Sequence, residues 1–227
     1  MCGRYAQYGP ISRPSRYCGV AEDHILVDEA PPRYNIAPSS DVLAVRLGAD
    51  GERELVRLKW GLVPSWAKEP ETGYSMINAR AETVDTKPAF RAAFHRRRCL
   101  IPADGWYEWQ PVPGQRWKQP WYFRHKSDEP LAFAGLWEHW QRGPQSLQTC
   151  TIIVCEANAL AAPIHDRMPV VLEPRDFAAW LDPKAPADQA KALLMPTPVK
   201  TLRAYKVSRA VNSTAHDGPQ LIEAQPG

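Results

Sequence analysis

The alternation of apolar and polar residues along the chain predicts many short β-strands. Asp41–Leu47 and Arg53–Trp60 alternate in this way, and residues 48–51 between them are turn formers, so we expect a β-hairpin. Runs rich in aromatic, aliphatic and β-branched residues predict further strands at residues 99–103, 121–125, 131–137, 149–155 and 202–207. Residues 76–83 have polar side chains at every second position, which is typical of an extended segment with one polar face.

A second group of segments has the spacing of short helices. They are residues 16–29, which Pro31 and Pro32 would stop, and residues 87–98, 157–162, 177–181 and 187–194. In residues 87–98 the apolar side chains share one face, and the other face carries Arg91, Arg96, Arg97 and Arg98. Such a basic face is either a solvated surface or an attraction for phosphate.

Composition narrows the class of protein. The chain has 227 residues, of which 44% are hydrophobic, and no linker, repeat or low-complexity run, so we expect one domain over residues 1–227 with an irregular tail from about residue 214. Five cysteines without a C-x-x-C pair argue against a disulfide scaffold and a structural zinc site. No apolar run is long enough for a membrane span or a signal peptide. The net charge of +3 permits nucleic-acid binding without requiring it.

The first residues carry the most specific chemistry. If Met1 is removed, Cys2 becomes a 1,2-aminothiol, whose amine has an ordinary pKa of about 7.7–8.0. The neutral amine can attack an aldehyde to give an imine, and the thiol can then close a thiazolidine ring, which an internal cysteine cannot form. Gly3 permits close approach of a ligand, and Arg4 offers a planar fork for phosphate. The alternative is that Cys2 is merely a small residue at a terminus.

Three other positions are candidates for acid–base or polar chemistry. Glu108 stands among large aromatic residues, which would raise its pKa, as in the lysozyme example of a carboxyl against a tryptophan; it is then either a general acid or a glutamate at the rim of the core. His165 and Arg167 are two residues apart beside prolines and are either catalytic or surface residues. Asn78 and Arg80 share the polar face of the extended segment, which is either a site or a solvated surface.

Six segments occur in a characteristic order. They are residues 1–5 (MCGRY), 34–38 (YNIAP), 60–64 (WGLVP), 78–82 (NARAE), 99–109 (CLIPADGWYEW) and 165–169 (HDRMP). This succession, which spans nearly the whole chain, resembles the SOS-response-associated-peptidase (SRAP) family, which shields abasic sites in single-stranded DNA. The resemblance implies an α+β fold with a mostly antiparallel, barrel-like sheet core, short flanking helices and a basic channel for the DNA strand.

The resemblance also implies roles for individual residues. Cys2 would be the mature N-terminus and would form a reversible thiazolidine crosslink with the ring-opened sugar. Asn78 would place the cysteine and the sugar, Glu108 would be the acid and base, and His165 would transfer protons and assist reversal. The implied DNA contacts are Arg4, Arg80, Arg167, Trp66, Trp106, Trp109 and Pro38. One departure is Val154-Cys155, where the family has paired threonines, so that a hydroxyl able to bind substrate is missing there.

Two other classes of function stay open at this point. An N-terminal-nucleophile hydrolase would use the Cys2 thiol on an amide with its own amine as the base, giving a transient acyl-enzyme instead of a stable adduct. A binding module without enzymatic activity would hold single-stranded DNA with tryptophans and arginines, and its affinity would not depend on Cys2. If the chain crosslinks abasic sites, we expect a monomer in the cytoplasm that is associated with the nucleoid when bound to abasic DNA or to single-strand/double-strand junctions. We expect no cofactor or metal.

Overall fold

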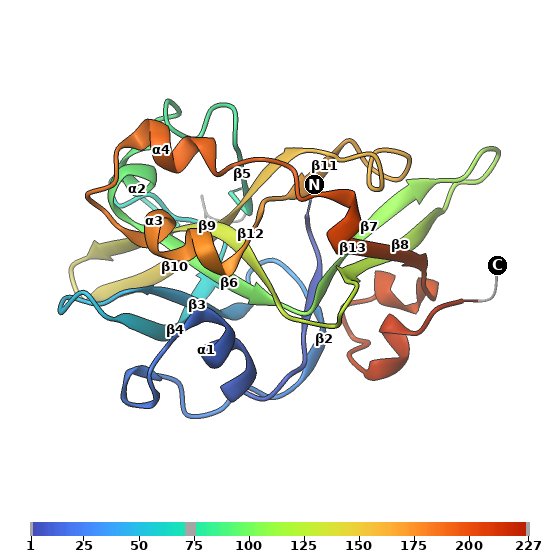
Figure 1. Ribbon diagram of the computed structural model, residues 1–227, viewed down its shortest axis with the longest axis horizontal. Helices are drawn as coiled ribbons and strands as arrows, with labels where there is room; N and C mark the ends of the chain where they lie inside the picture. The colour runs from blue at the N-terminus through green and yellow to red at the C-terminus, as the bar shows by residue number, and fades with distance from the viewer. Residues whose placement is uncertain (1, 71–75, 226–227) are drawn as a thin grey trace.

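The computed structural model describes residues 2–70 and 76–225, and its strands form two sheets (Figure 1). The smaller sheet contains, in spatial order, β13 (Leu202–Lys206), β8 (Lys118–His125), β7 (Gly105–Pro111), β1 (Tyr5–Gln7) and β2 (Arg33–Ile36). The larger sheet runs β11 (Arg167–Pro169), β10 (Gln145–Glu156), β4 (Arg53–Trp60), β3 (Asp41–Leu47), β6 (Arg98–Ala103), β9 (Leu131–Arg142) and β12 (Val171–Leu172), and β5 (Asn78–Arg80) also pairs with β10.

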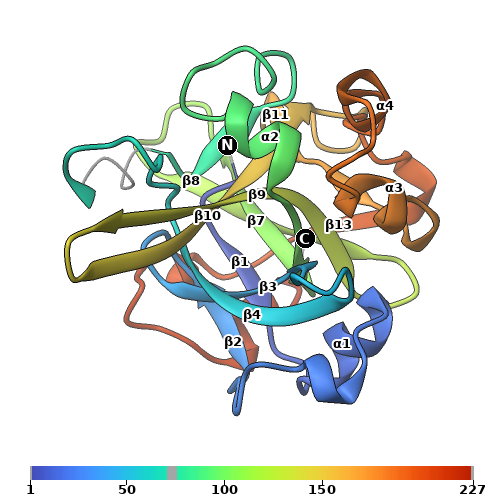
Figure 2. The ribbon, with the colours of Figure 1, turned by 90° about the vertical axis from the view of Figure 1, so that its left-hand side faces the viewer.

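A barrel forms the centre of the larger sheet. Strand β10 pairs with β4 on one side and with β9 on the other, so β10, β4, β3, β6 and β9 close into a ring (Figure 2). The pairings of β10 with β4 and β5 are parallel, and the other strand pairings are antiparallel. Ring closure leaves fewer unpaired strand edges in the barrel. The expected α+β fold with a barrel-like antiparallel core is therefore confirmed.

The β3–β4 hairpin has the predicted bounds at both strands. Its register runs from Asp41 opposite Lys59 to Leu47 opposite Arg53. In β4 the buried residues Val56, Leu58 and Trp60 alternate with Arg57 and Lys59, and a shift of one residue in register would exchange the faces of these two sets. The alternating pattern and the glycine turn therefore specify the same pairing. The predicted strands at residues 99–103, 121–125, 131–137, 149–155 and 202–207 are also present, several with longer bounds.

The helices are short and lie around the barrel. They are α1 (Ser12–Cys18), α2 (Arg91–Arg96), α3 (Phe177–Leu181) and α4 (Ala187–Ala192), with 3-10 turns η1 (Glu22–His24), η3 (Pro174–Asp176), η4 (Val199–Thr201), η5 (Arg209–Asn212) and η6 (Pro219–Ile222). The predicted helix at residues 16–29 is wrong. Helix α1 starts earlier and ends at Gly19, whose left-handed φ of 66° allows its N–H to bond back to carbonyls of the last turn.

The predicted outward position of Arg98 is also wrong. Helix α2 ends at Arg96, and Arg98 is a buried residue of β6. Its guanidinium donates hydrogen bonds to the carbonyl oxygens of Phe94, Trp180 and Asp182. These bonds satisfy carbonyls at the C-terminal ends of α2 and α3, so Arg98 joins two helices to the barrel instead of extending a basic surface.

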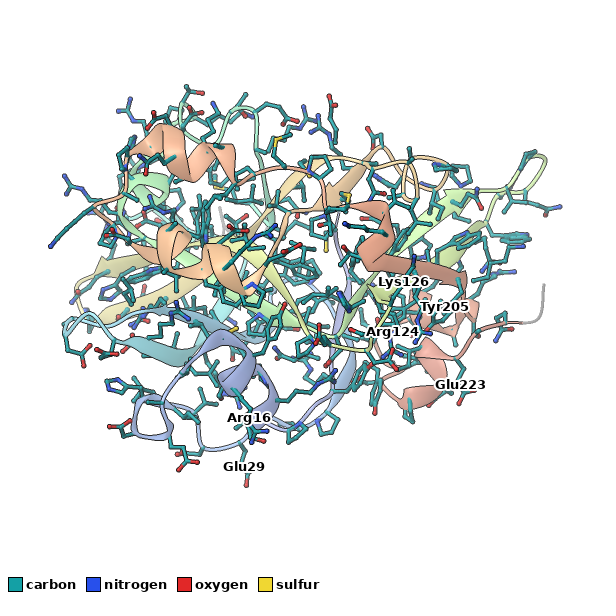
Figure 3. All side chains as sticks on the ribbon, in the orientation of Figure 1. Arg16, Glu29, Arg124, Lys126, Tyr205 and Glu223 are labelled. Atoms are coloured by element: carbon teal, nitrogen blue, oxygen red, sulfur yellow. The ribbon has the colours of Figure 1, made fainter. Side chains whose placement is uncertain are left out.

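The C-terminal segment is more ordered than the predicted irregular tail. Leu221, within η6, is fully buried, and Tyr205 Oη donates to the carbonyl of Ile222 at 2.9 Å. In Figure 3 Tyr205 and Arg124 lie on β13 and β8, and Glu223, which follows η6, lies below them. The tail therefore covers the smaller sheet. Within the described residues, no helix is long and apolar enough to cross a membrane.

Gly105, where β7 begins, offers a test of the packing between β7 and β8 in the smaller sheet. A Cβ at this position would collide with the backbone oxygen of Phe123 and the ring of Tyr122. Because backbone cannot move aside cheaply, we expect Gly105→Ala to destabilise the fold by about 1–3 kcal/mol, which lowers the melting temperature by roughly 2–12 °C. In the matched variant Gly218→Ala, the new methyl meets only the flexible end of Gln220. Equal melting curves for the two variants would contradict this packing argument.

Candidate active site at the start of the chain

Strand β1 places the start of the chain against β7. Tyr5 lies opposite Trp106 and Ala6 opposite Gly105, and the Tyr107 N–H donates to the Arg4 carbonyl at 3.0 Å. Continuing this register towards the terminus places Gly3 opposite Glu108. Glycine has no side chain, so space is left beside the carboxyl group. Met1, whose removal the family resemblance implies, lies outside the described residues.

Cys2 is fully buried at this place. Burial raises the pKa of its thiol well above the ordinary value, and the negative charge of nearby Glu108 raises it further. The Asn78 Nδ2 atom donates to the Cys2 backbone carbonyl at 2.9 Å. The amide of Asn78 therefore holds the backbone next to the thiol.

Glu108 is a buried carboxyl group with 1% of its surface exposed. Burial raises its pKa to about 7, and the charge of Asp166 acts in the same direction, whereas Lys118 opposes it. Trp106, two residues earlier on the same face of β7, stacks on Phe123 with ring centroids 4.8 Å apart. With a pKa of about 7, the carboxyl group can hold or release a proton near neutral pH.

Strand β10 brings the other two motifs to the same region. It pairs with β5 through Ile152–Val154 and with β11 through Val154–Glu156. Asn78 begins β5 opposite Ile152, and His165 lies two residues before β11, whose Arg167 is opposite Glu156, so both motifs are attached to the second half of β10. In Figure 1 the chain begins at the upper side of the molecule, beside β11, and runs downward from there.

His165 is half-buried, and burial lowers the pKa of its imidazole, although the charge of Asp166 acts in the opposite direction. The Arg167 N–H donates to His165 Nδ1 at 3.0 Å. In the neutral ring Nδ1 is then the acceptor and Nε2 carries the proton. Asp166 Oδ1 lies 2.9 Å from the same Nδ1, an ion pair only when the ring is protonated. His165 can therefore present a proton at Nε2.

A side-chain contact joins β7 to the histidine loop, residues 157–166, which carries His165. Gln110, two residues after Glu108, donates from Nε2 to the Pro163 carbonyl at 2.9 Å. Lys118, on the neighbouring strand β8, lies close enough that its charge lowers the pKa of both Glu108 and His165. Lys118 was not a sequence candidate, because its sequence separation from both groups gives no signal.

The three candidate arginines differ in how they are held. Arg4 is half-buried and donates from Nη1 to Asn35 Oδ1 at 2.7 Å and to the Val211 carbonyl at 2.9 Å. Arg167 forms an ion pair with Glu82 at 2.5 Å. Arg80 is exposed on β5. Arg80 thus has the most accessible guanidinium of the three, whereas Arg4 and Arg167 are already oriented by protein groups.

The aromatic candidates and Pro38 also differ in exposure. Trp66 is 60% exposed, and Trp109 is half-buried, with its Nε1 donating to Asn212 Oδ1 at 2.7 Å. Pro38, half-buried, follows β2. Trp106 is fully buried, so the expected contact between Trp106 and DNA is wrong: the ring belongs to the core and packs against Phe123 and Phe133.

Asn35 and Cys155 are two further buried residues of these sequence segments. Asn35 is buried and donates from Nδ2 to the carbonyls of Val211, Ser213 and His216, which explains the asparagine in the segment 34–38 as a clamp on the C-terminal chain. At the Val154-Cys155 departure, Cys155 is buried and burial raises its pKa to about 12, so it is a neutral thiol. The described residues contain no cluster of His, Cys, Asp or Glu able to hold a metal ion.

Comparison with known proteins places this arrangement in a family. The SOS response associated peptidase (SRAP) profile matches residues 1–214. The abasic site processing protein YoqW of Bacillus subtilis is 40% identical over 227 residues, covering 99% of this chain and 100% of that protein. The abasic site processing protein HMCES of Gallus gallus is 30% identical, covering 98% of this chain and 77% of that protein.

Solved structures show the same fold. A protein from Bacteroides thetaiotaomicron superposes with a TM-score of 0.86 at 21% identity, over 99% of this chain and 100% of that chain. A phage-related protein from Bordetella bronchiseptica superposes with a TM-score of 0.74 at 34% identity, over 92% of this chain and 95% of that chain. The structural similarity therefore covers both the barrel and the smaller sheet that carries Glu108.

Proposed function

Since the chain belongs to the SOS response associated peptidase (SRAP) family, we propose that it captures abasic sites in single-stranded DNA as a covalent thiazolidine at Cys2. The names of the relatives YoqW and HMCES support the abasic site as the target. The observation that carries the proposal is the meeting of Cys2, Asn78 and Glu108, which come from separate segments, around the one residue able to become an aminothiol.

The reaction needs no oxidant or reductant. Once Met1 has been removed, the Cys2 amine attacks the aldehyde carbon of the ring-opened sugar, and a C–N bond forms. The former carbonyl oxygen takes up protons and leaves as water, giving an imine. The thiol sulfur then adds to the imine carbon, its proton goes to the nitrogen, and the five-membered ring closes. The aldehyde is consumed, so the strand is protected from the elimination that would cleave it.

Each neighbouring group has a task in this scheme. Glu108, with a pKa of about 7, protonates the leaving oxygen and in its ionised form transfers the thiol proton to the nitrogen. Asn78 holds the Cys2 backbone so that nitrogen and sulfur face the same carbon. Arg80 binds a flanking phosphate, with Arg4, Arg167, Trp66, Trp109 and Pro38 as further contacts along the strand.

An abasic site has no nucleobase, which fits recognition through the phosphates and the aldehyde. Arginines that bind phosphate supply affinity without reading sequence, and the aldehyde itself supplies the selectivity. An amidase that uses the same Cys2 would need no aldehyde and would form no stable adduct. We expect the protein to act as a monomer on single strands in the cytoplasm, including strands at duplex junctions.

A denaturing gel tests the function directly. Purified protein is mixed with single-stranded DNA that carries one abasic site, and intact mass establishes in parallel whether residue 1 has been removed. We expect a shifted band that forms without borohydride and survives heating. No band from protein with a verified N-terminal cysteine would exclude the proposal and direct attention to amide substrates.

Replacement of His165 separates the reverse reaction from the forward one. Ring opening of the thiazolidine needs a proton on the leaving sulfur, and His165 Nε2 can deliver one. We expect His165→Ala to slow DNA release from preformed adduct by about tenfold or more, measured by transfer to an excess of unlabelled abasic DNA. The exposed His139 on β9 provides the matched control, His139→Ala. Normal release in His165→Ala would assign the reverse proton transfer to another group.

A further inference from the structure

We propose that the hairpin arm, residues 111–118 between β7 and β8, forms with η5 a second contact surface for the DNA strand, where Trp117 stacks on a nucleobase and Arg116 and Arg209 bind phosphates. This inference rests on the proposed function, because the occupant is the same strand that carries the lesion. It concerns nucleotides beyond the reacting sugar, and none of these three residues belongs to the six segments of the family resemblance.

The aromatic part of this surface is held in place by its neighbours. The Arg209 guanidinium carbon lies 4.7 Å from the centre of the Trp117 ring. Trp117 Nε1 donates to Gln115 Oε1 at 2.9 Å. Trp117 is nevertheless half-exposed, and Arg116 and Arg209 are exposed. A fixed indole with exposed guanidinium groups beside it combines the two features that bind single strands without sequence preference.

The surface is continuous with the candidate active site. At the base of the hairpin arm, Trp109 Nε1 donates to Asn212 Oδ1 of η5 at 2.7 Å, and Gln119 Nε2 donates to the Val207 carbonyl at 3.0 Å. Gln110 bonds to Pro163 next to the histidine loop. The hairpin arm is thus connected on one side to η5 and on the other to the loop that carries His165.

The charge of the surface points to a polyanion. Residues 111–118 contain Arg116 and Lys118 and no acidic residue. Within the part of the chain that the structure describes, neither of these cations nor Arg209 forms an ion pair with a carboxylate. In Figure 1 the hairpin arm projects beyond the rest of the molecule from the end of β7 and β8. A strand that leaves the site along β7 therefore meets these cations next.

Binding measurements with a stable tetrahydrofuran analogue of the abasic site test the inference, because this analogue has no aldehyde and cannot crosslink. We expect Trp117→Ala to weaken binding about fivefold or more when the flanks are on the order of ten nucleotides long. With flanks of about two nucleotides on each side, wild type and variant should bind equally. Lengthening only one flank at a time then identifies which side of the lesion the hairpin arm contacts.

A second tryptophan–arginine pair supplies the matched control. Arg46 lies 4.2 Å over the ring of Trp137 on β9, away from the proposed strand path, and Trp137→Ala should leave DNA affinity unchanged. Arg209→Ala should reduce the slope of log affinity against log salt concentration by about 0.7, and Trp117→Phe should retain most of the affinity. Equal binding of wild type and Trp117→Ala to the long strand would overturn the inference, while crosslinking of a short strand would still support the proposed function.

Discussion

Cys2→Ala should abolish the heat-stable crosslink to abasic single-stranded DNA completely, while affinity for the tetrahydrofuran analogue stays near that of wild type. The variant keeps an amine at residue 2 once Met1 is removed, so an imine can still form, but no sulfur is present to close the ring. The imine hydrolyses on heating and is trapped only with borohydride. A denaturing gel with and without borohydride separates the two species.

Two controls make this result specific to the aminothiol. Cys155→Ala removes the buried thiol at the neighbouring end of β10 and should crosslink like wild type. A protein with an uncleaved extension before Cys2 keeps the thiol but has an amide nitrogen, and it should not crosslink. A stable crosslink in Cys2→Ala would show that another nucleophile reacts, and the proposal would fail.

Glu108→Gln should slow crosslink formation by roughly 10²–10⁴-fold, the usual contribution of a positioned general acid or base. The amide fills nearly the same space as the carboxyl group but cannot exchange a proton. Affinity for the analogue should not change, because binding depends on the arginines and tryptophans. Single-turnover gels give the rate, and Glu156→Gln, an exposed glutamate on β10, is the control. An unchanged rate in Glu108→Gln would show that Glu108 is not the general acid or base of the reaction.

The pH dependence of the crosslinking rate follows from the pKa values of Glu108 and the Cys2 amine. Glu108 donates a proton only when protonated, below its pKa of about 7, whereas the Cys2 amine attacks only when neutral, above its ordinary pKa of about 7.7–8.0. The rate should therefore be highest at about pH 7.5 and fall on both sides. In Glu108→Gln the fall at high pH should disappear, and only the fall at low pH should remain.

Sequence patterns predict the local structure best where two signals agree. The β3–β4 hairpin has both an alternating pattern and a glycine turn, and its bounds are as expected. The helix predicted at residues 16–29 had a weak apolar face, and the left-handed Gly19 ends α1 inside that range. Arg98 matches a basic helix face in sequence, yet its hydrogen-bond acceptors at Trp180 and Asp182 are more than eighty residues away.

The site residues also divide into those that the sequence can identify and those that it cannot. The chemistry of Cys2 and Glu108 can be inferred from residue type, because an aminothiol and a carboxyl group among aromatic residues each have a definite reactivity. Composition cannot distinguish the buried Trp106 from the exposed Trp66, since both are tryptophans beside small or apolar residues. Lys118 has no motif, and its proximity to Glu108 and His165 depends on the pairing of β7 with β8.

The position of β1 between β2 and β7 has a consequence for the order of events during synthesis. Residues 2–7 are synthesised roughly 100 residues before β7, which at 5–20 residues per second is about 5–20 s. During that time Cys2 cannot be buried against β7, because Glu108 has not been made. An aminopeptidase acting on the nascent chain therefore meets residue 1 before folding buries Cys2. Maturation of the nucleophile then requires no opening of the finished fold.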